Sequence, residues 1–199
     1  PVERSWKQQQ QFVADASHEL KTPLTVILSS SELAAEERDP EKTRRYVEGI
    51  HAESLRMKGL VEDMLTLART ENGTNQVQSA VDLSDTVLES VLAFEPVAFE
   101  SGRELSYDIQ PGLETQGVAV QLRRLADILL DNAVKYAAAG TSIRLLLRRE
   151  GRNALLQVEN RGETIPAEKI SHLFDRFYRA DESRAGGEGF GLGLAIAQN

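Results

Sequence analysis

The chain has 199 residues, of which 41% are hydrophobic, 27% charged and 6% aromatic, so it has enough apolar side chains for a packed core and too many for a disordered chain. Its 31 acidic residues outnumber 23 Lys and Arg, and the net charge of -8 argues against a protein that coats nucleic acid or acidic lipid. The absence of cysteine excludes disulfides, thiolate metal sites and cysteine nucleophiles, and the three histidines lack the spacing of a zinc site.

Two long segments, 12–34 and 47–68, repeat apolar or small residues in steps of three and four, which predicts two amphipathic helices. The inward stripes comprise Val13, Ala16, Leu20, Pro23, Ile27, Ser30 and Ala34, then Val47, Ile50, Ser54, Met57, Val61, Met64 and Ala68. Proline suits the first turn of a helix and disfavours helical geometry in the residue before it. The first helix should therefore end near Arg38, and the second should begin near Pro40. Such a hairpin leaves its stripes half covered, so we expect a homodimer that forms a four-helix bundle.

A polar segment, 71–75, contains Gly73 and is expected to link this hairpin domain (1–72) to a second domain (73–199). Strands are predicted near 77–81, 105–109, 142–148 and 154–159, with helices near 84–101 and 119–138 and a last helical run from Leu192. A turn is expected around Gly151, and Asp82 or Ser84 would cap the first of these helices. The fold class is therefore α+β, a helical hairpin followed by an α/β sandwich.

The first helix carries the candidate nucleophile. His18 lies off the apolar stripe, on the face of Lys21, Thr22 and Thr25, and should point to solvent. A lone surface histidine is usually only a solvated side chain. A neutral imidazole, however, has a lone pair that can attack an electrophile, and an adjacent Glu19 would hold the proton of the other ring nitrogen.

The segment Phe12 to Leu24, FVADASHELKTPL, resembles the H-box of the sensor histidine kinases of two-component signalling systems. In that family the histidine accepts the γ-phosphoryl group of ATP, the adjacent acid assists as a base, and the threonine one turn later helps to hydrolyse the phosphorylated partner protein. The resemblance implies these catalytic roles for His18, Glu19 and Thr22.

A second motif, Asp131 to Tyr136, follows apolar residues on a predicted helix. Helical asparagines are usually exposed or bonded to the backbone. Asn132 with Lys135 three residues later would nevertheless place an oxygen ligand for Mg²⁺ beside a cation for phosphate. The segment also resembles the N-box of the same family, which implies that Asn132 coordinates Mg²⁺, Lys135 contacts phosphate and Tyr136 packs near the nucleotide.

Glycines gather just before the last helical run, where positive φ angles allow backbone amides to approach an anion. A glycine cluster alone is at least as often a plain flexible loop. Here Gly189, Gly191 and Gly193 resemble the G2 box of the family. The resemblance implies that these glycines and Leu192 bind ATP, with the preceding residues as a lid.

Residues 173–179 resemble the F-box of the family. We expect Phe174 and Phe177 to pack at the base of the lid. Arg179 and Arg184 are expected to approach the phosphates.

One motif departs from the family. The usual Asp-x-Gly-x-Gly turn, whose carboxylate accepts a hydrogen bond from the adenine amino group, is replaced by Asn160-Arg-Gly162-Glu-Thr164. Asn160 keeps a carbonyl acceptor but loses the charge-assisted part of the bond, and Thr164 restricts the turn. Asn160 and Gly162 are still predicted to contact the nucleotide, with ATP affinity weakened and not abolished.

The H-box, N-box, F-box and G2 box, in that order along the chain, predict an enzyme, an ATP-dependent protein-histidine kinase that uses Mg²⁺ and ATP to phosphorylate His18. The resemblance implies that it passes the phosphoryl group to an aspartate of a response regulator and also dephosphorylates that partner. Three alternatives remain. They are a phosphatase or nucleotide-gated scaffold with weak kinase activity, an ATPase of related fold that has no use for His18, and an inert dimerisation module.

The ends of the chain predict a larger protein. The first residue is Pro1 and not Met, and the family's ATP-binding domain normally continues past the G2 helix, whereas this chain stops at Asn199. No apolar run approaches the roughly 20 residues that span a bilayer, so we expect these residues to be soluble. By resemblance they form the cytoplasmic part of a parent anchored in the cell membrane.

Overall fold

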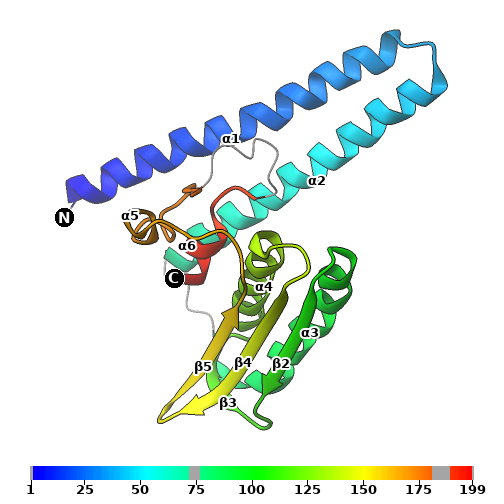
Figure 1. Ribbon diagram of the computed structural model, residues 1–199. Coiled ribbons are helices and arrows are strands. Elements are labelled where there is room, and N and C mark those ends of the chain that lie inside the picture. The colour runs from blue at the N-terminus through cyan, green and yellow to red at the C-terminus, as the bar shows by residue number, and fades with distance from the viewer. Residues whose placement is uncertain (1, 72–76, 181–188, 199) are drawn as a thin grey trace.

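The computed structural model describes residues 2–71, 77–180 and 189–198 (Figure 1). Helices α1 (Val2–Glu36) and α2 (Pro40–Glu71) form a long antiparallel hairpin, and α1 begins well before the predicted start at Phe12. The turn is built from local polar contacts. The Glu37 carboxylate accepts from the backbone N–H groups of Arg38 and Asp39, and the Asp39 carboxylate accepts from that of Glu41 at 3.0 Å. The predicted boundary at Asp39-Pro40 is confirmed.

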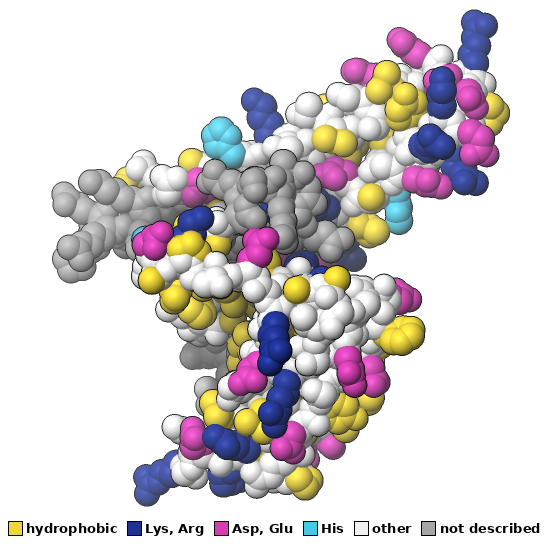
Figure 2. Space-filling model, in the orientation of Figure 1, with side chains coloured by type: hydrophobic (Ala, Val, Ile, Leu, Met, Phe, Trp, Pro, Cys, Tyr) yellow, Lys and Arg dark blue, Asp and Glu magenta, His cyan; other side chains and the backbone are white. Residues whose placement is uncertain are grey.

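The hairpin buries only part of its apolar surface. Ala16 and Pro23 of α1 are buried as predicted, whereas Val13, Val47 and Val61, which were assigned to the inward stripes, are 58%, 54% and 43% exposed. Other exposed large hydrophobic residues of the hairpin are Trp6, Leu24, Val26, Leu28, Leu33, Leu55 and Leu65. Hydrophobic side chains are visible on the hairpin surface in Figure 2. Two helices can cover only one face of each other, so the exposure of the three valines in a single chain fits stripes that were expected to stay half covered without a second copy.

The second domain is a layer of helices on a small mixed sheet. Its elements are β1 (Ser79–Asp82), α3 (Leu83–Glu100), β2 (Glu104–Ile109), β3 (Glu114–Gly117), α4 (Ala119–Tyr136), β4 (Ser142–Glu150), β5 (Asn153–Glu159), α5 (Ala167–Ile170) and α6 (Gly193–Gln198). In the order β2-β4-β5, β2 pairs parallel to β4 and β4 antiparallel to β5. Alternate residues Ile143, Leu145 and Leu147 of β4 are buried in the core that includes residues of α3 and α4.

The structure confirms the predicted order of these elements and adds two. Strand β3, which pairs antiparallel with β1, and the short α5 were not predicted. Asp82 caps α3, since its carboxylate accepts the backbone N–H of Asp85 at 2.9 Å. The alternative cap, Ser84, has another role. Its buried hydroxyl donates to the Gln110 carbonyl and accepts the Leu113 N–H, which ties the β2–β3 turn to α3.

The second domain lies under the end of the hairpin that contains the N-terminus, and α6 packs against both α2 and α4 (Figure 1). In the part of the chain described above, no helix combines the length and apolarity that a membrane crossing requires. The predicted link between the domains lies largely at 72–76, outside the described residues.

Candidate functional site

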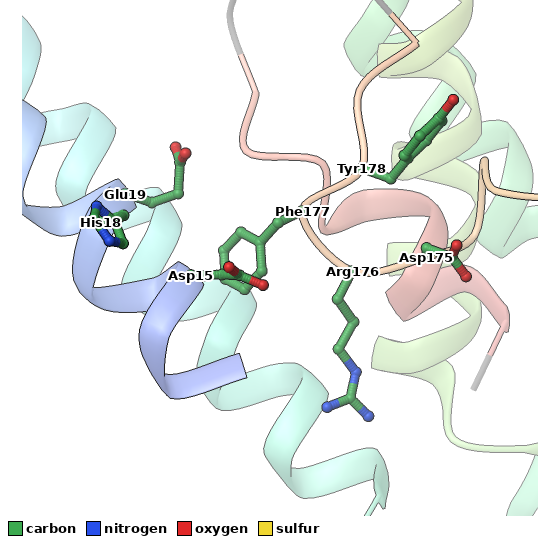
Figure 3. A pocket seen from close by; sticks show the side chains of 7 residues that line it. All are labelled: Asp15, His18, Glu19, Asp175, Arg176, Phe177 and Tyr178. Atoms are coloured by element: carbon green, nitrogen blue, oxygen red, sulfur yellow. The ribbon is translucent and has the colours of Figure 1, made fainter. Parts of the chain in front are cut away.

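Helix α1 presents His18 on an exposed face, as its periodicity predicted. Lys21, Thr22 and Thr25 are exposed on the same side, and the Thr22 hydroxyl lies 3.5 Å from the carbonyl oxygen of His18. The neighbouring Glu19 is half-buried. Figure 3 shows the Glu19 carboxylate extending away from the ring of His18, so their expected contact is not made in this arrangement.

A cavity of about 430 Å³ opens beside His18. Asp15, His18 and Glu19 line it from α1, and residues 175–178 close the opposite side (Figure 3). The Phe177 ring lies 5.8 Å from the Phe12 ring, and the Arg176 guanidinium lies 5.4 Å from the centre of the same ring. The predicted phosphoacceptor helix therefore faces the F-box segment, and the lining includes none of the described residues predicted to bind phosphate.

Helix α4 carries the predicted metal and phosphate residues on its last turns. The Asn132 amide nitrogen donates to the Ile128 carbonyl at 3.0 Å, so the side-chain oxygen is the atom that suits Mg²⁺. The Lys135 ammonium pairs with Asp131 at 2.6 Å and lies 3.6 Å from the position that a Cβ on Gly189 would occupy. The fold thus brings the N-box and the glycine segment side by side. In the described ranges no three or more histidine and carboxylate side chains are grouped so that they could hold a metal ion.

The 160–162 loop lies against the C-terminal end of α4. A Cβ on Gly162 would lie 2.1 Å from the Tyr136 carbonyl oxygen, a distance that only glycine permits. The Ala138 N–H donates to the Arg161 carbonyl at 2.7 Å, and the Asn160 amide nitrogen lies 3.6 Å from the Gly162 Cβ position. Asn160, Gly162 and half-exposed Tyr136 therefore lie together at this end of α4, and their contact with a nucleotide stays a prediction.

The glycine segment, residues 189–193, packs against the F-box, residues 173–179. Gly189 and Gly191 have φ angles of 121° and 71°, which favour glycine. A Cβ on Gly191 would lie 2.6 Å from the Tyr178 carbonyl oxygen, and the Phe177 N–H donates to the Gly191 carbonyl at 3.0 Å. Phe177 itself adopts a φ of 60°, a costly conformation for a bulky residue, which this contact and the Phe12 ring support.

Several remaining predictions have different outcomes. Gly193 begins α6 with its Cβ position 3.4 Å from Ile128, and the Leu192 side chain is buried, so a nucleotide contact by Leu192 would fall to its backbone. Phe177 packs against the buried cluster, whereas Phe174 is 45% exposed, and its packing against the lid stays a prediction because residues 181–188 lie outside the described residues. The phosphate role of Arg179 stays a prediction. Arg184 and the glycines at 186 and 187 lie outside the described residues.

A contact between the two domains was missed by the sequence analysis. A buried cluster joins Leu60, Leu67, Ile128, Phe190, Leu192 and Ile196. The Arg56 guanidinium lies 5.0 Å from the Phe190 ring, and Asp63 of α2 forms an ion pair with Arg124 of α4. Burial raises the pKa of the Asp63 carboxyl, and the charge of Arg124 only partly opposes this shift. Residues next to the predicted nucleotide site, among them Phe190 and Arg124, therefore also bind the second domain to the hairpin.

Comparisons with known proteins agree with this division of the chain. A model of the His Kinase A (phospho-acceptor) domain matches residues 8–73, and a model of the histidine kinase-, DNA gyrase B- and HSP90-like ATPase family matches residues 117–199. Sensor protein DltS of Streptococcus agalactiae serotype V is 34% identical over 199 residues, which cover all of this chain and 50% of DltS. Sensor histidine kinase YkoH of Bacillus subtilis is 38% identical over 205 residues, which cover 98% of this chain and 43% of YkoH.

A solved structure shares the fold. It is histidine kinase ThkA in complex with response regulator protein TrrA, with a TM-score of 0.70 and 19% identity over 89% of this chain and 55% of that one. The chain spans about half the length of the curated relatives it matches. It belongs to the sensor histidine kinases of two-component signalling systems. The α1–α2 hairpin is its phospho-acceptor part, and the second domain is its ATPase-type part.

Proposed function

We propose that this chain is the catalytic core of an ATP-dependent protein-histidine kinase and that His18 is the residue it phosphorylates. The observation that carries the proposal is the meeting of three distant segments in the ATPase-type domain. Lys135 lies beside Gly189, and Gly162 presses against Tyr136, while an exposed His18 stands on the phospho-acceptor helix. A cation, glycine backbone amides and a close-packed loop are the elements that hold a nucleoside triphosphate.

In the proposed reaction a ring nitrogen of His18 attacks the γ-phosphorus of ATP. A P–N bond forms, the P–O bond to ADP breaks, and the proton on the other ring nitrogen is held by Glu19 once its carboxylate turns toward the ring. Lys135 and the backbone N–H groups from Gly189 onward would neutralise the phosphate oxygens. Asn132 would hold Mg²⁺, which supplies further charge neutralisation when bound.

This chemistry requires the second domain to move or a second chain to take part. The cavity beside His18 is lined by α1 and 175–178 and not by the Lys135 and Gly189 region, so the imidazole does not share a cavity with the predicted phosphate-binding residues. Transfer to His18 follows either a rearrangement of the second domain relative to the hairpin or a reaction across a dimer. Thr22, exposed one turn from His18, is proposed to position the water that dephosphorylates the partner.

We propose that a second copy of the chain packs on the exposed apolar side chains of the hairpin. Val13, Leu24 and Leu28 of α1 and Val61 and Leu65 of α2 are all at least 43% exposed, which is unusual for so many large apolar side chains on two helices. A dimeric four-helix bundle would bury them.

The proposed phosphoryl acceptor is an aspartate of a response regulator, which docks on the hairpin near His18. The solved complex of ThkA with response regulator protein TrrA supports a partner of this class. The placement of the chain as the cytoplasmic part of a protein anchored in the cell membrane stays a prediction.

Labelled ATP tests the proposal. The purified protein, incubated with magnesium and γ-labelled ATP, should gain label that is lost in acid and survives alkali, and His18→Gln should gain none. Continued ATP turnover by His18→Gln, with no phosphoprotein in the wild type, would instead favour the ATPase alternative. Unlabelled His18 with normal dephosphorylation of a response regulator would favour the phosphatase alternative, and absence of Mg-ATP binding would favour the inert module.

A further inference from the structure

Arg103, in the short connection between α3 and β2, uses all three nitrogens of its guanidinium group to bond two backbone carbonyls. Its Nε and Nη2 donate to the Ala137 carbonyl at 2.9 and 2.6 Å, and its Nη1 donates to the Ser101 carbonyl at 2.9 Å. The residue is itself fixed, because its backbone N–H donates to the Ala98 carbonyl at the end of α3. A guanidinium engaged in this way serves to fasten backbone and not to receive a phosphate.

The carbonyl that Arg103 holds lies at the end of the helix predicted to bind phosphate and metal. Ala137 is the C-cap of α4, directly after Tyr136 and two residues after Lys135. The last carbonyls of a helix have no intrahelical partners and carry the negative end of its dipole, so a cation that bonds there fixes the helix end. Arg103 therefore sets where the last turn of α4 lies relative to α3.

The loop predicted to accept the adenine base is attached to the same point. One residue beyond Ala137, the Ala138 N–H donates to the Arg161 carbonyl at 2.7 Å. The Thr141 hydroxyl, which donates to the Ala138 carbonyl at 2.7 Å, also lies 3.4 Å from the Arg161 carbonyl. With Gly162 pressed against the Tyr136 carbonyl, the helix end and the 160–162 loop meet at a single joint.

We propose that Arg103 is a positioning residue of the nucleotide site, which sets the 160–162 loop at its correct distance from the phosphate-binding turn of α4. This inference rests on the proposed function of that site. Arg103 touches no predicted ligand of the nucleotide, so its effect is indirect. Its removal should misplace the base relative to the phosphates, and the binding of ATP should suffer more than the transfer of phosphate from ATP already bound.

Arg103→Met, which keeps the aliphatic length and removes every donor, tests the role, with Arg103→Lys as the milder variant and Arg152→Met as the matched control. Arg152 is an exposed arginine in the β4–β5 turn, away from this joint. Since hydrogen bonds to charged groups contribute strongly, we expect Arg103→Met to raise the Kd for ATP about tenfold. Phosphorylation at saturating ATP should change less than about twofold, and Arg103→Lys should be intermediate because an ammonium lacks the planar fork.

Two further readouts separate positioning from general stabilisation. The preference for ATP over GTP should fall in Arg103→Met, because the displaced loop carries the predicted base acceptor Asn160. Hydrogen exchange without nucleotide should speed up in peptides that cover 136–141 and 158–163 but not in those of β4. Unchanged ATP affinity and base preference alongside faster exchange would overturn the inference, as would a slower rate at saturating ATP with unchanged Kd. If the wild type binds no ATP, the proposed function is contradicted and not the role of Arg103. In that case unchanged hydrogen exchange in Arg103→Met would still refute the claim that Arg103 holds the end of α4 against the 160–162 loop.

Discussion

Asp63 of α2 and Arg124 of α4 form an ion pair that joins the hairpin to the ATPase-type domain. The Asp63 side chain is 19% exposed and that of Arg124 is 45% exposed. The pair lies on the α4 face whose Ile128 packs with Leu60 and Leu67 of α2. Polar and apolar contacts between the domains are therefore adjacent on one helix face.

Arg124→Gln should loosen the docking of the domains more than Asp63→Asn does. Removal of the arginine leaves a largely buried carboxylate without its cation, whereas removal of the carboxylate leaves an arginine that water reaches. Because the protein has no cysteine, single cysteines introduced at exposed Lys58 and Gln121 can carry spin labels. Distance distributions should broaden in the order wild type, Asp63→Asn, Arg124→Gln. The reverse order, or three equal distributions, would show that the pair does not hold the domains.

The same carboxylate predicts a dependence of stability on pH. Burial, the main cause, raises the pKa of Asp63 above its ordinary value of 3.8. Between that value and the raised pKa, the folded protein binds more protons than the unfolded chain, so this group's contribution to stability falls as pH rises through the window. In urea titrations the free energy of unfolding of the wild type minus that of Asp63→Asn should therefore decrease with rising pH and then level off. An increase over the same interval would contradict the assigned cause.

Glu37 offers a comparison of opposite sign. Hydrogen bonds from the backbone N–H groups of Asp39 and Arg38 lower the pKa of its carboxyl. Its contribution is present above its ordinary pKa of 4.5 and is lost as pH falls through the lowered value. The difference between wild type and Glu37→Gln should thus shrink on acidification. The two trends running in the same direction would be inconsistent with this assignment.

Gly162→Ala should damage nucleotide binding with little effect on the hairpin. The added Cβ would lie 2.1 Å from the Tyr136 carbonyl oxygen, so the 160–162 loop must move away from α4. Overpacking of this kind costs about 1–3 kcal/mol, and if that cost falls on the ATP-bound state the Kd for ATP rises by about 5-fold to 150-fold. Calorimetric titration with Mg-ATP measures it.

Gly59→Ala is the matched control for that substitution. Gly59 lies in α2, and beyond the adjacent helix backbone no atom lies within 4 Å of its Cβ position; alanine in a helix interior is favoured over glycine by about 1 kcal/mol. This variant should bind ATP as the wild type does and melt at a higher temperature. Equal ATP affinities of Gly162→Ala and Gly59→Ala would show that the 160–162 loop is not part of the nucleotide site.

Leu28→Lys should turn the proposed dimer into a monomer. Leu28 is 56% exposed on α1, where a second hairpin would bury it, and a lysine there would place charges in an apolar seam. Leu92→Lys is the control, since Leu92 is similarly exposed on α3 at 53% but lies outside the hairpin. Light scattering after size-exclusion chromatography should give a monomer only for Leu28→Lys. A monomeric wild type, or an undisturbed dimer in Leu28→Lys, would refute this interface.

Sequence reasoning predicted local features well where a strong local pattern exists. The helix boundary at Asp39-Pro40 and the exposed position of His18 followed from proline geometry and from helical periodicity. Strand β3 was missed because Glu114–Gly117 is short and polar and is ordered by its pairing with the distant β1. The residues of β3 do not themselves predict a strand, because its order depends on the pairing with β1.

Contacts between the domains could not be predicted in the same way. Phe12 was recognised only as part of a motif, yet its ring packs on Phe177, more than half the chain away. The contact of the Arg56 guanidinium with the Phe190 ring likewise depends on how α2 is placed against the second domain. Glycine patterns marked the loop at Gly162, but only the fold reveals which carbonyl presses on it.

The location of phosphorus in the protein after reaction with magnesium and ATP tests the central claim most directly. Proteolysis at neutral pH followed by fragmentation mass spectrometry should find one phosphorylated site, the imidazole of His18, in the wild type and none in His18→Gln. Phosphorus on another side chain, or an unmodified His18 peptide after prolonged incubation of ATP-bound protein, would contradict the account.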